Sequence, residues 1–330
     1  VITEHYKGNE AQKRATLKES YEFVLKDLDK ATEYLKVDED EEGDLYDMPY
    51  FTEFACHALR ARVSLYMHRW DDAIKYASKV INSKRYFMAS CTQNIGSTSM
   101  YDYQWQEGKS TEGIWKVEFT LNSYGGALGT VFSNYNYATY RPDYVPAKWV
   151  INSYDNNDLR VSSIFRNVTT GYEHALNWPM LIKYMGDSDF RRNNILHVHR
   201  PTVLRLSEQY LIRAEAYAMK EEYTKAGKDI STLRTARYST YGGNTALSKS
   251  NAMDVIEAER VKELYMEGFR LNDLKRWHKG FKRNINDQPA ANFVQSSLKV
   301  EKDDPLFVWP IPQHELEAPG SEIEPNESNK

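Results

Sequence analysis

Residues Glu259 to Trp277 read ERVKELYMEGFRLNDLKRW, which combines a regular apolar pattern with a high density of charge. At helical spacing, one face is apolar and holds Val261, Leu264, Tyr265, Phe269, Leu271 and Leu274. A second face carries carboxylates four residues apart, at Glu259, Glu263 and Glu267. The pattern predicts one packed helix over 259–277, interrupted at Gly268 because a bulky Cβ does not fit there. We expect its charges, Arg270 and Asp273 among them, to pair with neighbouring elements and to serve structure rather than catalysis.

The same stretch carries a long motif, ER–x–x–EL–x–x–EG–x–R–x–x–DL–x–RW, which ends at Arg276–Trp277. This motif resembles the SusD/RagB family, the surface nutrient-binding lipoproteins of Bacteroidetes. Two further segments agree with the family: LRLSEQYLIRAEA at 204–216 and FVWPIPQHEL at 307–316. The resemblance covers essentially all 330 residues, and it implies that the chain matches the later, larger part of a typical family member.

Length and charge exclude several classes of protein. The 330 residues suffice for one large domain, and a net charge of −4 argues against nucleic acid as a partner. No apolar run reaches the ~18–20 residues that span a bilayer. The first residues, VITEHYKGNE, lack a signal peptide's basic and apolar regions and an initial Met, so we expect a trimmed chain. Two cysteines, Cys56 and Cys91, are too few for a disulfide framework or a structural zinc site, and Cys56 fits a buried helical position.

Two segments with the same internal spacing predict helical hairpins, at 53–83 and at 206–237. Four positions of the first match four of the second at an offset of 153 residues: Arg60, Ala61, Trp70 and Ala73 against Arg213, Ala214, Tyr223 and Ala226. Small residues at the helix crossing and an aromatic at the turn are typical of tetratricopeptide repeats. A further amphipathic helix is predicted within 11–36. We therefore expect a single all-α domain over 1–330, a superhelix of tetratricopeptide-like hairpins with long irregular insertions and at most short strands.

The segment between the hairpins, residues 85–200, has a different character. Alternation at 114–119 predicts a short strand, and an interleaved run of tyrosine and asparagine follows. We expect an irregular insertion that carries binding residues on a helical scaffold. Loops are also predicted at 38–44, 238–251 and 284–297, an apolar closing segment at 306–316, and a frayed tail from 320.

Catalytic signatures are absent from the sequence. It contains no GxSxG, HExxH, P-loop or GxGxxG motif. Asp155, Asp158, Asp187 and Asp189 are a weak match to glycosidase carboxylates. His197 and His199 fit an ordinary surface strand better than a metal site, and the acidic run at 38–44 fits a solvated loop better than a calcium site. We expect no enzyme, no cofactor and no metal.

Recognition of a sugar suits the insertion better. An aromatic plane covers the C–H face of a sugar ring, and amide or guanidinium groups bind its hydroxyls. The stretch NYNYATYRPDY at 134–144 interleaves both kinds of residue. It predicts a shallow platform built partly from Tyr135, Tyr137 and Tyr140 with Asn134, Asn136 and Arg141. Trp105 is an equal candidate for core and site, residues 172–174 have a similar composition, and Tyr144, Trp149, Tyr154 and Trp115 are expected in the core.

The resemblance implies a function and a location. A family member would bind glycans without catalysis, on the outer face of the outer membrane, and deliver them to a SusC-like TonB-dependent transporter. Its membrane attachment would be a lipid anchor on N-terminal residues that precede this chain, as would part of its ligand platform. Two alternatives stay open: a peptide-binding member of the family, and a tetratricopeptide-type adaptor that binds only protein. The sequence names neither the glycan nor the oligomeric state.

Overall fold

Two helical hairpins lie at the centre of the computed structural model, which describes Ile2 and residues 13–36, 50–172, 175, 177–284, 287 and 299–329. The first consists of α2 (Glu53–Tyr66) and α3 (Trp70–Ile81), the second of α8 (Leu206–Met219) and α9 (Tyr223–Arg237). Their boundaries keep the predicted offset of 153 residues (206 against 53, 219 against 66, 223 against 70). The predicted all-α fold and the register of its hairpins are therefore confirmed.

The equivalence of the hairpins extends to their turns and crossings. His68 and Glu221, also 153 apart, both have left-handed φ angles, 57° and 61°. The alanines predicted at the crossings, Ala61, Ala73, Ala214 and Ala226, are fully buried. Small side chains at these contacts allow the helix axes to approach closely. The hairpins also pack on each other, since α3 lies against α8.

Helices added to both sides of the hairpins complete the body. Helix α1 (Leu17–Tyr34) begins with a capping box formed by Thr16 and Glu19 and packs on α2. Helix α10 (Ala252–Glu263) packs on α8 and α9. Cys56 is buried, as predicted. Within the described residues, no helix is both long enough and apolar enough to cross a membrane.

The prediction of one helix over 259–277 is wrong. Helix α10 ends at Glu263, and α11 (Arg270–Arg276) begins after a turn of six residues. Met266 and Gly268 have left-handed φ angles of 59° and 87° within this turn. A Cβ at Gly268 would meet nothing within 4 Å, so glycine is favoured there by its backbone angle and not by lack of space.

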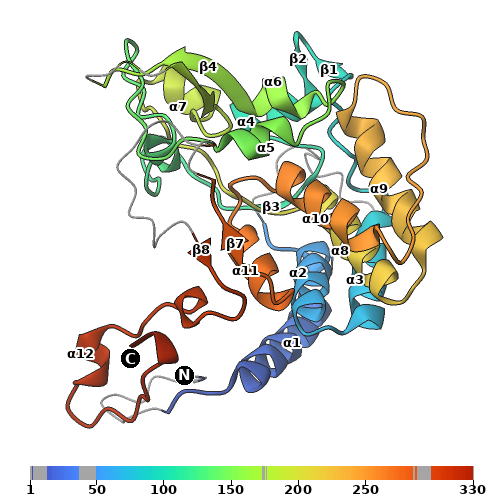
Figure 1. The fold of residues 1–330 in the computed structure, drawn as a ribbon, viewed down its shortest axis with the longest axis vertical. Coiled ribbons are helices and arrows are strands. Elements are labelled where there is room, and N and C mark those ends of the chain that lie inside the picture. The colour runs from blue at the N-terminus through green and yellow to red at the C-terminus, as the bar shows by residue number, and fades with distance from the viewer. Residues whose placement is uncertain are drawn as a thin grey trace.

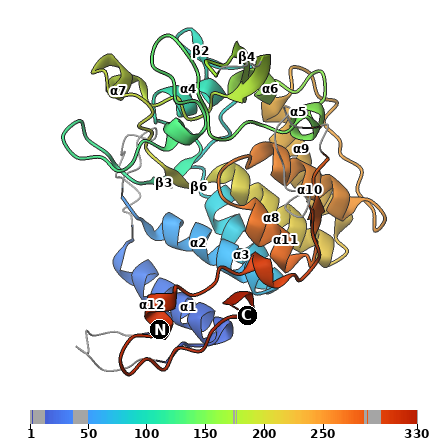
Figure 2. The ribbon, with the colours of Figure 1, turned by 60° about the vertical axis from the view of Figure 1, so that its left-hand side comes forward.

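The insertion forms a separate layer over one end of the helical body (Figures 1 and 2). Its strands occur in antiparallel pairs, of which β3 (Gly113–Lys116) with β6 (Thr202–Arg205) joins the insertion to the start of α8. Strand β3 is the predicted strand, shorter than expected. The other elements of this layer are β1 (Asn94–Ile95), β2 (Thr98–Ser99), α4 (Met100–Gln106), η1 (Leu128–Val131), α5 (Lys148–Asn152), α6 (Arg160–Ile164), β4 (Phe165–Thr169), β5 (Asn177–Leu181) and α7 (Ser188–Arg192).

The C-terminal segment lies beside α1 at the opposite end of the body (Figure 1). After the β7 (Phe281–Lys282) and β8 (Lys299–Val300) pair, it contains η4 (Pro305–Phe307), α12 (Gln313–Leu316) and η5 (Glu327–Asn329). The prediction of a frayed tail is wrong for the described part of the tail. The Asn329 side chain accepts a hydrogen bond from the Ile311 backbone N–H and donates one to the Ile311 carbonyl. The closing segment is also less buried than expected, since Phe307 is buried but Trp309 is exposed.

Three predicted features fall outside the described residues. They are the acidic run at 38–44, most of the loop at 284–297, and Glu173–His174. The loop predicted at 238–251 is confirmed by the ends of α9 and α10.

Candidate functional site

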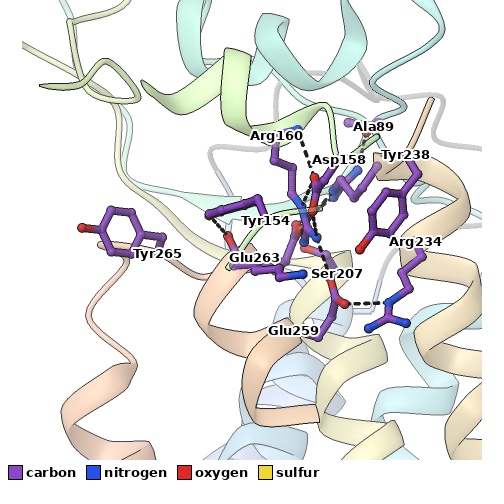
Figure 3. Close-up of polar contacts among 12 residues, drawn as sticks. Ala89, Tyr154, Asp158, Arg160, Ser207, Arg234, Tyr238, Glu259, Glu263 and Tyr265 are labelled. Atoms are coloured by element: carbon purple, nitrogen blue, oxygen red, sulfur yellow. Dashed lines mark hydrogen bonds and ion pairs between the residues drawn. The ribbon is translucent and has the colours of Figure 1, made fainter. Parts of the chain in front are cut away.

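A network of ionisable groups lies buried between the insertion and the helical body (Figure 3). Its centre is Glu263, whose carboxylate accepts hydrogen bonds from three guanidinium groups. Arg160 donates at 2.9 Å, Arg205 at 2.6 Å, and Arg237 at 2.8 and 3.0 Å. Burial by itself would raise the pKa of Glu263, but the adjacent Arg237 and Arg205 hold that pKa well below its ordinary value. Glu263 is therefore ionised at neutral pH.

The glutamates on either side of Glu263 in the sequence are paired in the same way. Glu259 accepts from Arg160 at 2.7 Å and from Arg234 at 2.8 Å. Glu267 accepts from Arg205 at 2.8 Å and from Lys183 at 2.6 Å. Burial opposes the ionised form of each, yet the cations lower the pKa of both carboxyls. The three glutamates thus neutralise cations that lie on the insertion, on β6 and on α9.

The predicted pairing of the charges in this stretch is confirmed. A general acid or base needs a pKa near the working pH and access to substrate, and these buried glutamates are fully paired. Arg276 and Asp273 form a second network, in which Asp273 accepts from Arg260 at 2.8 Å and Arg276 binds Glu215. Arg276 also lies over the Trp277 ring at 4.5 Å.

The four aspartates considered as glycosidase carboxylates are also held by protein groups. Asp158 pairs with Arg160 at 2.6 Å, and Asp155 accepts from the Tyr238 hydroxyl at 2.6 Å. Asp187 and Asp189 both pair with Arg200, at 3.0 and 2.7 Å. The geometry gives no support to glycoside hydrolysis.

The three predicted platform tyrosines come together in one tight hairpin, residues 133–141, which we call the tyrosine hairpin. The Tyr135 and Tyr140 rings stack at 4.5 Å across an antiparallel bridge. The Tyr137 ring meets Tyr135 edge-on at 5.9 Å. Tyr137 is 58% exposed, whereas the other two are half-buried. One ring is thus presented to solvent and the other two support it.

The polar residues of the tyrosine hairpin divide into two groups. Asn136 Oδ1 accepts from the Ala138 and Thr139 backbone amides, so this side chain shapes the turn. Arg141 Nε donates to the Gly171 carbonyl at 3.0 Å and is otherwise exposed. Asn134 is exposed, with a left-handed φ of 39°. Arg141 and Asn134 are therefore better placed to contact a ligand than Asn136.

The backbone at Tyr137 is in an unusual conformation. Its φ angle is 69°, a region that bulky side chains seldom adopt. Asn194 accepts a long hydrogen bond of 3.4 Å from the Tyr137 hydroxyl. Such strain concentrates at binding and catalytic sites, where the surrounding structure holds it in place.

His197 contacts two residues of the tyrosine hairpin, a role that the sequence did not indicate. Its Nε2 lies 2.8 Å from the Tyr135 carbonyl and its Nδ1 3.2 Å from Ser133 Oγ. Burial lowers the pKa of His197, so the ring is neutral and Nε2 donates. The expected surface strand at 197–199 is wrong, because both histidines are buried and His197 has a left-handed φ of 67°. No cluster of three metal-binding side chains occurs among the described residues.

Trp105 lies in the core and not on the platform. It is 5% exposed, meets the Tyr101 and Tyr184 rings edge-on, and lies 4.1 Å from Lys183 Nζ. Trp105 belongs to α4 of the insertion and packs in a buried apolar cluster with Tyr101 and Tyr184. The structure therefore separates Trp105 from the other predicted site residues.

Two residues expected in the core are instead exposed. Tyr144 is 63% and Trp149 is 45% exposed, whereas Tyr154 is buried and Trp115 is half-buried. Tyr144 lies three residues after the tyrosine hairpin and Trp149 lies in α5. Apolar neighbours in the sequence therefore did not predict whether these two side chains are buried. Tyr172 is also exposed, and its hydroxyl donates to the Pro142 carbonyl at 2.6 Å.

Solved structures share this fold. A SusD superfamily protein from Bacteroides thetaiotaomicron superposes with a TM-score of 0.78 at 23% identity, over 99% of this chain and 70% of that one. A SusD-like carbohydrate binding protein from Bacteroides vulgatus has a TM-score of 0.71 at 21% identity, over 93% of this chain and 66% of that one. The third is surface glycan-binding protein A from B. thetaiotaomicron in complex with laminarihexaose, with a TM-score of 0.70 at 20% identity, over 94% and 71% of the two chains.

These comparisons establish the fold and the approximate extent of the match. The chain spans about two-thirds of the length of these solved proteins. No curated protein sequence matches it. The sequence model of the SusD family matches residues 75–323, which include the signature stretch at 259–277 and both networks around it. The chain belongs to the SusD family.

Proposed function

We propose that this protein binds glycans at the tyrosine hairpin without catalysis and delivers them to a SusC-like TonB-dependent transporter. The observation that carries the proposal is the exposed Tyr137 ring, held in a strained conformation on a supported hairpin. An exposed aromatic plane suits the C–H face of a sugar, and the nearby Arg141 and Asn134 suit its hydroxyls. Family membership and the glycan-binding protein among the solved structures favour a sugar as the ligand.

The proposed partner and location rest on family membership. We place the protein on the outer surface of the outer membrane, held by a lipid anchor on residues upstream of this chain. Co-purification of the full-length protein from native outer membranes tests this arrangement. The transporter should accompany it under mild detergent, and recovery of a free monomer with no transporter would contradict the assignment.

Titration of single alanine variants tests the site. Loss of an exposed stacking ring costs ~1–1.5 kcal/mol, by analogy with aromatic pairs, so Tyr137→Ala should weaken glycan binding about tenfold. Tyr34→Ala is a matched control, because Tyr34 is an exposed tyrosine on α1, outside the insertion. Tyr135→Ala and Tyr140→Ala should reduce both affinity and stability, since these rings support each other.

The measurement is calorimetric titration of the full-length protein with a panel of polysaccharides and peptides, after circular dichroism has verified folding. Glycan affinity that stays equal in the parent, Tyr137→Ala and Tyr34→Ala would place the site elsewhere. Binding of peptides but no glycan would favour the peptide-binding alternative.

A further inference from the structure

A groove in the helical body forms where α8 and α9 meet the residues at the end of α3. These three helices lie together at one side of the body (Figure 1). The groove has a volume of about 470 Å³, within the range of about 300–1,000 Å³ that is typical of small-molecule sites. Every side chain that lines it, except Ile81, carries a polar group. The lining therefore suits a hydrophilic ligand.

The repeat of the two hairpins shows why space is left at the second one. Asp229 of α9 and Tyr76 of α3 are equivalent at the offset of 153 residues (229 against 76). The Tyr76 ring is 9% exposed and fills its position in the first hairpin. Three cations surround the centre of that ring at 4.4, 5.2 and 5.5 Å: Arg60, Lys75 and Lys79. In the second hairpin a shorter carboxylate takes the place of the ring and lines the groove.

The carboxylate of the groove is paired within the protein. Arg213 donates to the two oxygens of Asp229 at 2.8 and 2.7 Å, and to Ser78 Oγ at 3.1 Å. The Arg213 guanidinium also lies 5.7 Å from the centre of the Tyr210 ring. These contacts fix Arg213 and offset the negative charge of Asp229. The net charge of the groove is therefore set by its other ionisable groups.

Those groups are two lysines, Lys84 and Lys228. Both are exposed, and neither has an ion-pair partner within the residues that the structure describes. Lys84 follows the end of α3 with a left-handed φ of 60°, a conformation that is uncommon for a residue other than glycine. The whole chain has a net charge of −4. A polar groove with two positive charges in an acidic protein favours an anionic ligand.

We propose that this groove binds an acidic sugar, a uronic acid unit of a glycan, with its carboxylate at Lys84 and Lys228. Hydrogen bonds between ammonium and carboxylate are charge-assisted and therefore stronger than those to a neutral sugar. The Asn82 amide and the Thr232 hydroxyl, also in the lining, are groups that bind sugar hydroxyls. The groove and the tyrosine hairpin share no residue, so either site can bind when the other does not.

Three small probes test the proposal on the unmodified protein. Methyl α-D-glucuronide and methyl α-D-glucoside share a ring and differ in a carboxylate, whereas acetate carries the carboxylate without the ring. NMR titration should show saturable binding of the glucuronide, and binding of the glucoside and of acetate weaker by about tenfold or more. Absence of saturable glucuronide binding would overturn the proposal. So would a glucoside that binds equally well, or acetate that does, because the site would then not recognise the charge or the sugar.

Variants at exposed positions then locate the bound glucuronide. Lys84→Gln and Lys228→Gln should each weaken its binding about three- to fivefold, and the double variant about tenfold or more. Lys26→Gln is the matched control, because Lys26 is an exposed lysine on α1, outside the groove, and it should bind like the parent. Circular dichroism verifies that each variant is folded. Unchanged affinity in the double variant would overturn the proposal, and a loss in Tyr137→Ala instead would place the probe at the tyrosine hairpin.

Discussion

At the scale of single residues, two carboxylates of α10 lie in different surroundings, one fully buried and one near the surface. Glu263 is completely buried and receives four hydrogen bonds from three arginines. Glu257, on the same helix, pairs near the surface with Arg270 and Lys279. The desolvation cost of a buried charge is recovered only while its partners are present. Glu263 is therefore one of the carboxylates that offset the cost of burying the cations around it, beside Glu259 and Glu267.

This contrast predicts different losses of stability. Glu263→Gln should lower the free energy of unfolding by ~3–5 kcal/mol, because it leaves three guanidinium groups without their shared counter-ion. Glu257→Gln should cost no more than about 1 kcal/mol, as is usual for pairs near the surface. Urea denaturation followed by circular dichroism measures both. Equal losses in the two variants would mean that the network around Glu263 is not what holds the insertion to the body.

The exposure of Arg270 changes the loss of stability expected when its side chain is removed. Its pairing was predicted and is observed, with Glu257 at 2.8 Å, but its side chain is 41% exposed. Arg270→Ala should therefore cost about 1 kcal/mol or less, and not the larger amount expected for a buried pair. Differential scanning calorimetry measures this, with Arg237→Ala as the buried counterpart. A collapse of stability in Arg270→Ala comparable to that in Arg237→Ala would contradict the distinction.

At the scale of elements, sequence patterns predicted the structures that depend on residues close together in the chain. The hairpins could be predicted because an alanine crossing and an aromatic turn repeat at a fixed spacing. The break at 264–269 could not, since the apolar stripe continues through it and only Gly268 marks it. Glu263 meets Arg160 across 103 residues, and no periodicity in one sequence specifies such a partner. In the same way, composition identified the tyrosine hairpin but not its support by His197 or the burial of Trp105.

The break itself leads to a prediction about glycine. Gly268→Ala should destabilise the protein by about 1 kcal/mol, because alanine disfavours a φ of 87° even though space is available. Gly242→Ala is the matched control, since it also has open space but no left-handed angle. That variant should be neutral or slightly stabilising. Thermal unfolding of the two proteins compares them, and a loss in Gly242→Ala as large as that in Gly268→Ala would exclude backbone strain as the cause.

At the scale of the whole molecule, the buried charges couple folding to pH. Cations lower the pKa of Glu259, Glu263 and Glu267 below the ordinary 4.5 in the folded state. Such carboxyls contribute stability that is fully present above about pH 4.5 and is lost as the pH falls through their folded values. The ion pairs of these glutamates link the insertion to the helical body. Protonation of the glutamates in acid should therefore destabilise the insertion and the body together.

Protonation of a buried histidine should begin to reduce stability at a higher pH than protonation of the glutamates does. Burial, together with Lys79 and Lys75, lowers the pKa of His57 from 6.5 to about 4. The folded state therefore binds the His57 proton less readily than the unfolded state does, and stability should fall as the pH drops from about 6.5 to about 4. His197 contributes in the same direction, because burial lowers its pKa too. The melting temperature should be level just above pH 6.5, decline gradually below it, and fall more steeply below about pH 4.5.

The variant His57→Leu separates the two phases. It removes one of the groups that titrate between pH 4 and 6.5, so the first decline should become shallower while the steep loss below about pH 4.5 persists. His278→Leu is the control for replacing a histidine by leucine, because His278 is exposed and lies beside Asp303 on the surface. Differential scanning calorimetry from pH 3.5 to 8 measures all three proteins. A parent profile that is level down to pH 4.5, or a first decline of unchanged slope in His57→Leu, would show that the buried imidazole is not what makes the fold sensitive to mild acid.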